Sequence, residues 1–214
     1  MSTFVIIHGG GGTAAGWGLV SYALSNRGHD VVAMDLPCDD PSAGWPDYVE
    51  SVVEAAGEKD ALVLIAHSAG GFVAPLVCDR LPVRLIILVN AMIPVPGESF
   101  MEWWTNTGYE AQVNGPSDML ELYYHDVPHE AAVADMESEE GRENFPSEPW
   151  PLDAWPDVPT QFVLLRDDRL FPPEFMRRVV NERLGITPDE MGGGHMVMLS
   201  RPEELAAMLS DSSK

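Results

Sequence analysis

The chain has 214 residues, of which 45% are hydrophobic, and both values are typical of one globular domain with a sizeable buried core. Its 34 acidic and 12 basic residues give a formal net charge of −22. Because a surface this negative repels phosphate backbones and anionic lipid heads, we expect neither nucleic acid nor a membrane as a partner.

Apolar segments that predict strands alternate with segments of helical pattern over most of the chain. The first part predicts strands over 3–8, 30–35, 61–66 and 84–89, and helices over about 16–27, 46–57 and 69–80. The last part predicts a strand over 160–165, a helix over 173–184, a short strand near 186–190 and a helix over 202–210. This alternation predicts the α/β class: a mostly parallel sheet of about six strands with helices on both faces.

A glycine-rich loop follows the first predicted strand. The apolar residues 4–7 lead into His8-Gly9-Gly10-Gly11-Gly12. Such a bare backbone can present N–H groups to an oxyanion that develops during acyl transfer. We expect the N–H groups of Gly10 and Ala69 to form this oxyanion hole.

A serine flanked by small residues follows the third predicted strand. The apolar run 62–66 continues into His67-Ser68-Ala69-Gly70. A sharp strand-to-helix turn lifts a serine hydroxyl clear of its backbone, and it requires tiny side chains two residues to either side. The usual pattern is G-x-S-x-G, and here Ala66 replaces the first glycine. The motif predicts that Ser68 is a nucleophile.

The alternation breaks between residues 91 and 158, where the chain is rich in Pro, Trp, Met and Glu. We expect this segment to be a lid inserted in a single domain that spans 1–214, and to exclude water from the serine. Its aromatic residues imply an apolar pocket wall. Residues 126–130 predict a helix start with Asp126 as a possible cap, so His125 and His129 are expected to be surface or capping groups. Residues 137–141 are expected to form a solvated turn.

An acid and a histidine follow the serine in the order of a Ser-His-Asp triad. The strand over 161–165 ends in Arg166-Asp167-Asp168, and three glycines precede His195. A serine hydroxyl needs a base to remove its proton, and a histidine oriented by a carboxylate supplies one. The residues themselves leave Asp167 and Asp168 open as the acid.

The chain resembles the plant methylesterase and hydroxynitrile lyase branch of the α/β-hydrolases, together with its bacterial relatives. The resemblance is carried by His8-Gly9-Gly10, residues 28–36, the serine turn, residues 168–175 and Gly194-His195-Met196, and it covers little of 91–158. It implies the α/β-hydrolase fold. It also implies that Asp168, which opens a D-x-x-F-x-P-E-F run, is the catalytic acid. The glycine loop is longer here than in the plant members.

The resemblance also bears on the reaction. The lyases of this branch carry Glu before the serine and Lys after the histidine, whereas this chain has His67 and Met196. We therefore expect an esterase that forms an acyl-enzyme on a small or medium, largely uncharged carboxylic ester. The residues expected to contact this small-molecule substrate are Gly9, His67, Trp103, Trp104 and Met196. Cleavage of lactones, amides or carbon–carbon bonds, lyase activity, and a ligand-binding pseudoenzyme stay open as alternatives.

Several further features limit the function classes. The sequence has no Cys/His cluster with metal-ligand spacing, so we expect neither a metal nor a cofactor. Cys38 and Cys78 do not form a disulfide framework, and we expect a loop thiol and a core thiol rather than nucleophiles. The N-terminus has no basic region, and the apolar runs are too short to cross a bilayer, so we expect a cytoplasmic protein. The sequence makes no prediction about oligomeric state.

Overall fold

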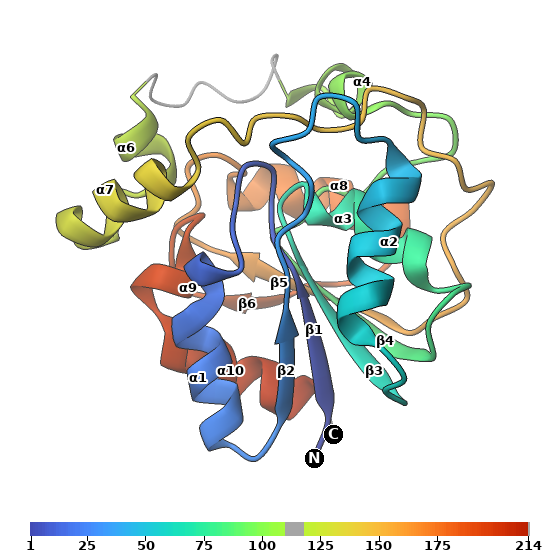
Figure 1. Ribbon diagram of the computed structural model, residues 1–214. Coiled ribbons are helices and arrows are strands. Elements are labelled where there is room, and N and C mark those ends of the chain that lie inside the picture. The colour runs from blue at the N-terminus through green and yellow to red at the C-terminus, as the bar shows by residue number, and fades with distance from the viewer. Residues whose placement is uncertain (110–117, 214) are drawn as a thin grey trace.

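A parallel sheet forms the centre of the computed structural model, which describes residues 1–109 and 118–213 (Figure 1). Its strands are β1 (Thr3–Ile7), β2 (Asp30–Ala33), β3 (Leu62–His67), β4 (Val83–Val89), β5 (Thr160–Leu165) and β6 (Asp189–Met191). Their order across the sheet is β2-β1-β3-β4-β5-β6, and each neighbouring pair is parallel. The predicted α/β architecture is confirmed.

Helices cover both faces of the sheet (Figure 1). The short 3-10 helix η1 (Ala15–Trp17) leads into α1 (Gly18–Asn26), which packs on one face with α9 (Val197–Ser200) and α10 (Pro202–Ser212). The other face carries α2 (Trp45–Ala56), α3 (Gly70–Val73) and α8 (Pro173–Leu184). Alternate strand residues, such as Phe4 and Val5, enter opposite core layers, which explains the continuous apolar runs in the central strands β1, β3 and β4. Within the described residues, every helix is too short or too polar to cross a bilayer.

The helix after the serine turn is shorter than the sequence predicts. Helix α3 ends at Val73, and the chain continues as a 3-10 helix, η2 (Ala74–Val77). Pro75 lacks a backbone N–H, and its ring clashes with the carbonyl four residues earlier, so it cannot continue an α-helix. The prediction of one helix over 69–80 is therefore wrong.

The two cysteines are free thiols, one in a loop and one against the core. Cys38 lies in the expected loop but is fully buried, and the hydroxyl of Tyr48 donates to its sulfur at 3.6 Å. Cys78 packs against the core and is partly exposed. Burial together with nearby Asp79 raises the pKa of the Cys78 thiol to about 12, which disfavours its thiolate.

The segment between β4 and β5 lies over the carboxyl ends of the strands (Figure 1). Its helices are α4 (Phe100–Asn106), α6 (Met119–Tyr123) and α7 (His129–Ser138). One expectation within it is wrong and another holds only in part. Asp126 does not cap α7, because Pro128 occupies the cap position and the Asp126 carboxylate accepts from Gly194 N–H at 2.8 Å. Residues 137 and 138 belong to α7, so the expected turn is confined to residues 139–141, and Glu139 within it is partly buried.

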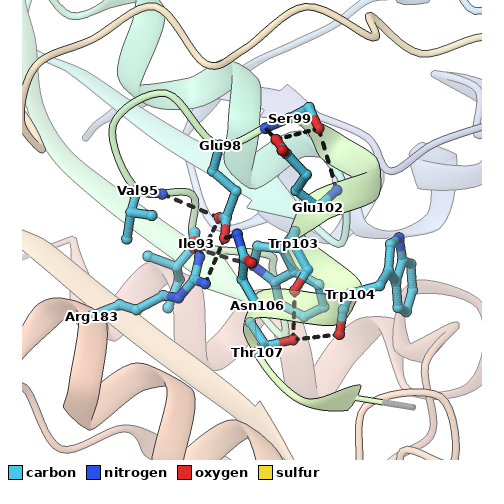
Figure 2. Close-up of polar contacts among 10 residues, drawn as sticks. All are labelled: Ile93, Val95, Glu98, Ser99, Glu102, Trp103, Trp104, Asn106, Thr107 and Arg183. Atoms are coloured by element: carbon cyan, nitrogen blue, oxygen red, sulfur yellow. Dashed lines mark hydrogen bonds and ion pairs between the residues drawn. The ribbon is translucent and has the colours of Figure 1, made fainter.

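A buried ion pair joins Glu98, just before α4, to Arg183 of α8 (Figure 2). The side chain of Glu98 is 1% exposed, and its two carboxylate oxygens accept from the guanidinium of Arg183. Asn106 Nδ2 donates to the same carboxylate at 3.0 Å, and the N–H of Val95 donates at 3.3 Å. Ser99 and Glu102 form a capping box that begins α4 beside this cluster. The polar contacts therefore fix α4 relative to α8.

Candidate active site

The strand order brings two chemically important loops together. β1 and β3 are neighbours, and Ile7 pairs with Ala66 at their carboxyl ends. The chain winds away from β1 in both directions, toward β2 on one side and β3 on the other. Loops that leave such a reversal point diverge and open a crevice at the carboxyl edge of a parallel sheet. The glycine loop after His8 and the serine turn after His67 both lie at this crevice.

The serine turn is strained and tightly packed. Ser68 has φ of 50°, in the left-handed region that non-glycine residues rarely adopt. An added Cβ would lie 2.6 Å from the carbonyl oxygen of Ile7 at Gly70, and 1.9 Å from that of Met92 at Gly71. The two glycines thus allow the turn to approach neighbouring backbone, and strain of this kind is concentrated at functional sites.

Asp168 and His195 form a buried hydrogen-bonded pair. Nδ1 of His195 lies 2.7 Å from Oδ2 of Asp168, and these residues are 1% and 3% exposed. Because a carboxylate only accepts, Nδ1 carries the proton, which leaves the lone pair on Nε2. His195 lines the same cavity as Ser68. A base and a hydroxyl therefore share one solvent-accessible space.

The loop that ends at His195 is held by hydrogen bonds to side chains from three segments, two of them acceptors and one a donor. Gly193 N–H donates to Asp167 Oδ2 at 2.7 Å, and Gly194 N–H donates to Asp126 Oδ2 at 2.8 Å. Nε2 of His67 donates to the carbonyl oxygen of His195 at 3.0 Å. Burial, with a further contribution from His195, lowers the pKa of His67 well below its usual value, so this ring is neutral. The two aspartates that follow β5 thus have different contacts: Asp168 contacts the imidazole of His195, and Asp167 contacts the backbone of the glycines that precede His195.

His8 fixes the backbone of the first glycine loop. Its Nδ1 donates to the carbonyl oxygen of Gly9 at 2.7 Å, and its Nε2 accepts from Leu36 N–H at 2.9 Å. Burial lowers the pKa of His8 to about 4, so the ring holds this single tautomer at neutral pH. Since C=O and N–H point in opposite directions across a trans peptide, a fixed Gly9 carbonyl also fixes the direction of Gly10 N–H.

Two residues with unpaired backbone N–H groups lie close together at the cavity. An added Cβ on Gly10 would lie 3.6 Å from Cβ of Ala69, and both residues line the cavity with Ser68. Within residues 1–109 and 118–213, the N–H groups of Gly10 and Ala69 have no hydrogen-bond acceptor. Unpaired N–H groups beside a serine are the arrangement that stabilises an oxyanion.

The cavity above Ser68 has a volume of about 740 Å³, and its lining includes two chemically different groups of residues. The apolar and aromatic group includes Met92, Phe100, Trp104 and Phe145. The acidic group includes Asp135 and Glu139. Of the residues expected to contact a substrate, Gly9, His67, Trp104 and Met196 all line this cavity.

Trp103 lies elsewhere. It is fully buried, its Nε1 donates to the carbonyl oxygen of Ile93 at 3.1 Å, and its ring lies 5.4 Å from that of Phe171. Trp103 and Trp104 are consecutive residues of α4, so their side chains leave the helix about 100° apart. Only Trp104 faces the cavity.

The acidic part of the cavity lining contains a tyrosine between two carboxylates. The hydroxyl of Tyr124 donates to Asp135 Oδ2 at 3.1 Å and reaches Glu139 Oε2 at 3.4 Å. Burial, together with the charge of Asp135, raises the pKa of Glu139 to about 7. Burial also raises the pKa of Asp135 above its usual value. Sequence reasoning missed these residues because only the fold brings α7 and the turn after it to the cavity.

Comparisons with known proteins agree with this geometry. A model of the "Alpha/beta hydrolase family" matches residues 4–208. "Probable esterase PIR7A" of Oryza sativa subsp. indica is 28% identical, over 96% of this chain and 94% of that protein. "Alpha-hydroxynitrile lyase" of Arabidopsis thaliana is 25% identical, over 97% and 95%. The crystal structure of polyneuridine aldehyde esterase has a TM-score of 0.79 at 21% identity, with 100% of both chains covered. The predicted resemblance and fold are confirmed.

Proposed function

The chain belongs to the alpha/beta hydrolase family, and on this premise we propose that it is a serine esterase that hydrolyses small or medium, largely uncharged carboxylic esters. The observation that carries the proposal is the convergence at one cavity of a strained serine and a histidine bonded to a buried aspartate. Relatives named as esterases, such as "Esterase PIR7B" of Oryza sativa subsp. japonica at 27% identity, support the ester specificity.

In the proposed mechanism, Ser68 Oγ attacks the ester carbonyl while Nε2 of His195 accepts the hydroxyl proton. Asp168 keeps the imidazole in the required tautomer and stabilises the cation that forms. The N–H groups of Gly10 and Ala69 donate to the oxyanion. His195 then gives the proton to the leaving alkoxide, and water repeats the sequence to release the acid.

The cavity supports a neutral substrate with apolar parts. Its aromatic residues Trp104, Phe100 and Phe145 suit a hydrocarbon or aryl group. Met196 adds an apolar contact beside His195, and Gly9 leaves room beside Ser68. His67 lines the same wall as a neutral ring.

We further propose that residues 91–158 act as a lid within one domain. The segment contributes Trp104, Tyr123 and Phe145 to the cavity wall, and contacts between Asp126 and Gly194 join it to the histidine loop. A cover of this kind excludes water from the acyl-enzyme until hydrolysis. A cytoplasmic location remains a prediction from the sequence.

The proposal is tested with p-nitrophenyl esters of graded acyl length and with a fluorophosphonate. We expect turnover of the esters and a covalent adduct on Ser68 by peptide mass spectrometry. The Ser68→Ala variant should stay folded, because alanine keeps the backbone and Cβ, and should lose both turnover and labelling. Labelling on Cys38 or Cys78 instead, or an Ser68→Ala variant with wild-type turnover, would contradict the assignment.

A further inference from the structure

Asn90 is a buried polar residue at the edge of the site that does not line the cavity. It directly follows β4, is 0% exposed and has φ of 36°. Asparagine is among the few non-glycine residues enriched in this left-handed region, but the conformation still costs free energy. The contacts of the side chain explain why the fold keeps it there.

The amide of Asn90 uses all its polar atoms. Nδ2 donates to Oδ2 of Asp168 at 2.6 Å and to the carbonyl oxygen of Phe171 at 3.2 Å. Oδ1 accepts from Leu165 N–H at 3.3 Å. Because two acceptors face one end of the amide and a donor faces the other, its orientation is fixed by the network.

The carboxylate of Asp168 accepts four hydrogen bonds. On Oδ1 the donors are Leu170 N–H at 2.8 Å and Phe171 N–H at 2.9 Å, both from the loop of Asp168 itself. On Oδ2 the donors are His195 Nδ1 at 2.7 Å and Asn90 Nδ2 at 2.6 Å. The bond from Asn90 is therefore the one that joins the carboxylate to the neighbouring strand β4.

We propose that Asn90 is a positioning residue that holds Oδ2 of Asp168 toward His195 and favours the neutral imidazole. The first effect follows from the geometry of the network. The second follows because an amide donates more strongly to a carboxylate that no imidazolium has neutralised. Asn90 thus stabilises the state in which His195 can accept the proton of Ser68. This inference rests on the proposed esterase mechanism for its catalytic meaning.

Among the described residues, two other titratable rings pack against His195, and neither changes charge near neutral pH. His67 lies 4.6 Å away between ring centroids and Tyr123 lies 5.3 Å away. Burial lowers the pKa of His67 well below its usual value and raises the pKa of Tyr123 to about 12. Glu139, whose pKa is about 7, lines the same cavity but is present in the wild type and in the Asn90 variants alike. A difference in the titration of His195 between wild type and an Asn90 variant is therefore attributable to the bond that the variant loses.

The test compares Asn90→Ala with Asn106→Ala. Asn106 is a matched control because its Nδ2 also donates to a buried carboxylate, that of Glu98, at 3.0 Å (Figure 2). We expect Asn90→Ala to lower kcat about tenfold with little change in KM, and to move the acidic limb of kcat/KM upward by about one pH unit, as loss of one hydrogen bond to a charged group predicts. Asn106→Ala should leave the limb at its wild-type position.

The ring titration of His195 by NMR, assigned with a His195→Gln variant, gives a readout that does not need turnover. We expect the same upward shift in Asn90→Ala and in Asn90→Gly, whose glycine tolerates a positive φ and guards against misfolding of the alanine variant. An unchanged midpoint in both Asn90 variants would overturn the inference. Absence of ester turnover in the wild type would instead overturn the proposed reaction, and the NMR titration would still decide the role of Asn90.

Discussion

Asp168 contacts the imidazole of His195 at 2.7 Å, whereas its neighbour Asp167 turns away and accepts from Gly193 N–H at 2.7 Å. Of these two successive residues after β5, Asp168 therefore contacts the ring of His195, and Asp167 contacts the backbone of the loop that precedes it. The difference predicts that their amide variants behave differently.

We expect Asp168→Asn to lower kcat by about 10⁴-fold, because an amide stabilises neither the required tautomer nor the imidazolium. Asp167→Asn should have a far smaller effect, since its amide oxygen can still accept from Gly193. Steady-state kinetics on both variants provide the measurement. The reverse order of effects would assign the acid to Asp167.

The contact between Gly9 and Ser68 predicts a second activity defect. A Cβ at Gly9 would lie 2.9 Å from Cβ of Ser68, a separation that real Cβ atoms do not adopt, so Gly9→Ala must displace the serine or the loop. We expect a loss in kcat of about 10- to 100-fold, the effect of misplacing a reacting group by a fraction of an ångström to one ångström.

Gly18→Ala is the matched control for this variant. Gly18 begins α1 with helical dihedral angles, and nothing lies within 4 Å of an added Cβ. The control should keep wild-type activity and gain roughly 0.4–1 kcal/mol of stability. Equal activity in Gly9→Ala and Gly18→Ala would show that the loop moves away without cost.

The sequence predicts those parts of the site in which the local backbone conformation allows only a few residue types. The serine turn needs small residues at 66 and 70, and the loop after His8 needs glycine where it approaches Ser68, so both motifs are visible in the chain. The central strands are equally visible, because burial on both faces leaves continuous apolar runs. The edge strand β6 is polar, and it begins at Asp189 rather than near 186 as predicted.

The parts that sequence does not predict depend on contacts between distant segments or on small rotations. Asp126 resembles a helix cap, but it pairs with Gly194, which is 68 residues away. Trp103 and Trp104 are both large and apolar, so only the orientation of α4 decides which faces the cavity. Nothing in the sequence distinguishes Asn90 from other asparagines at strand ends. Its contact with Asp168 is evident only once β4 and β5 are placed side by side.

The buried pair of Glu98 and Arg183 predicts a stability effect. Their side chains are 1% and 11% exposed, so Arg183→Ala leaves an unpaired charge in the interior. We expect a loss of about 3–5 kcal/mol in the free energy of unfolding, whereas replacing both residues with Met should recover much of it. Urea denaturation measures both. The exposed pair of Arg80 and Glu50 is the control, and Arg80→Ala should cost less than about 1 kcal/mol.

The raised pKa of Glu139, about 7 because of burial and the charge of Asp135, predicts a pH-dependent stability. Between the ordinary glutamate pKa and about 7, the folded protein holds a proton at Glu139 that the unfolded chain has released. The free energy of unfolding therefore gains nothing from Glu139 at low pH and falls as pH rises through this window. Glu139→Gln, which stays neutral, should raise Tm relative to wild type more at pH 8 than at pH 5.5.

Glu140→Gln provides the comparison, because Glu140 follows in the chain and is exposed. Because Glu140 is exposed to solvent, the difference in Tm between Glu140→Gln and wild type should be the same at each pH. Thermal unfolding followed by circular dichroism gives the four differences. A pH-independent effect of Glu139→Gln would mean that Glu139 is ionised throughout this range.

The neighbours of the triad predict that this chain is an esterase rather than a lyase, although a plant hydroxynitrile lyase is among its relatives. Cyanohydrin cleavage releases cyanide, an anion that a cation beside the catalytic histidine could hold. Here Met196 offers a polarisable apolar contact, and His67 is neutral and donates to the carbonyl oxygen of His195 at 3.0 Å.

We expect hydrolysis of aryl or methyl esters and no cyanide from mandelonitrile or acetone cyanohydrin. A His67→Glu, Met196→Lys double variant should gain at most slight lyase activity, since Glu cannot donate to the His195 carbonyl. Efficient cyanide release by the wild type without ester turnover would show that the charge beside His195 does not decide the reaction.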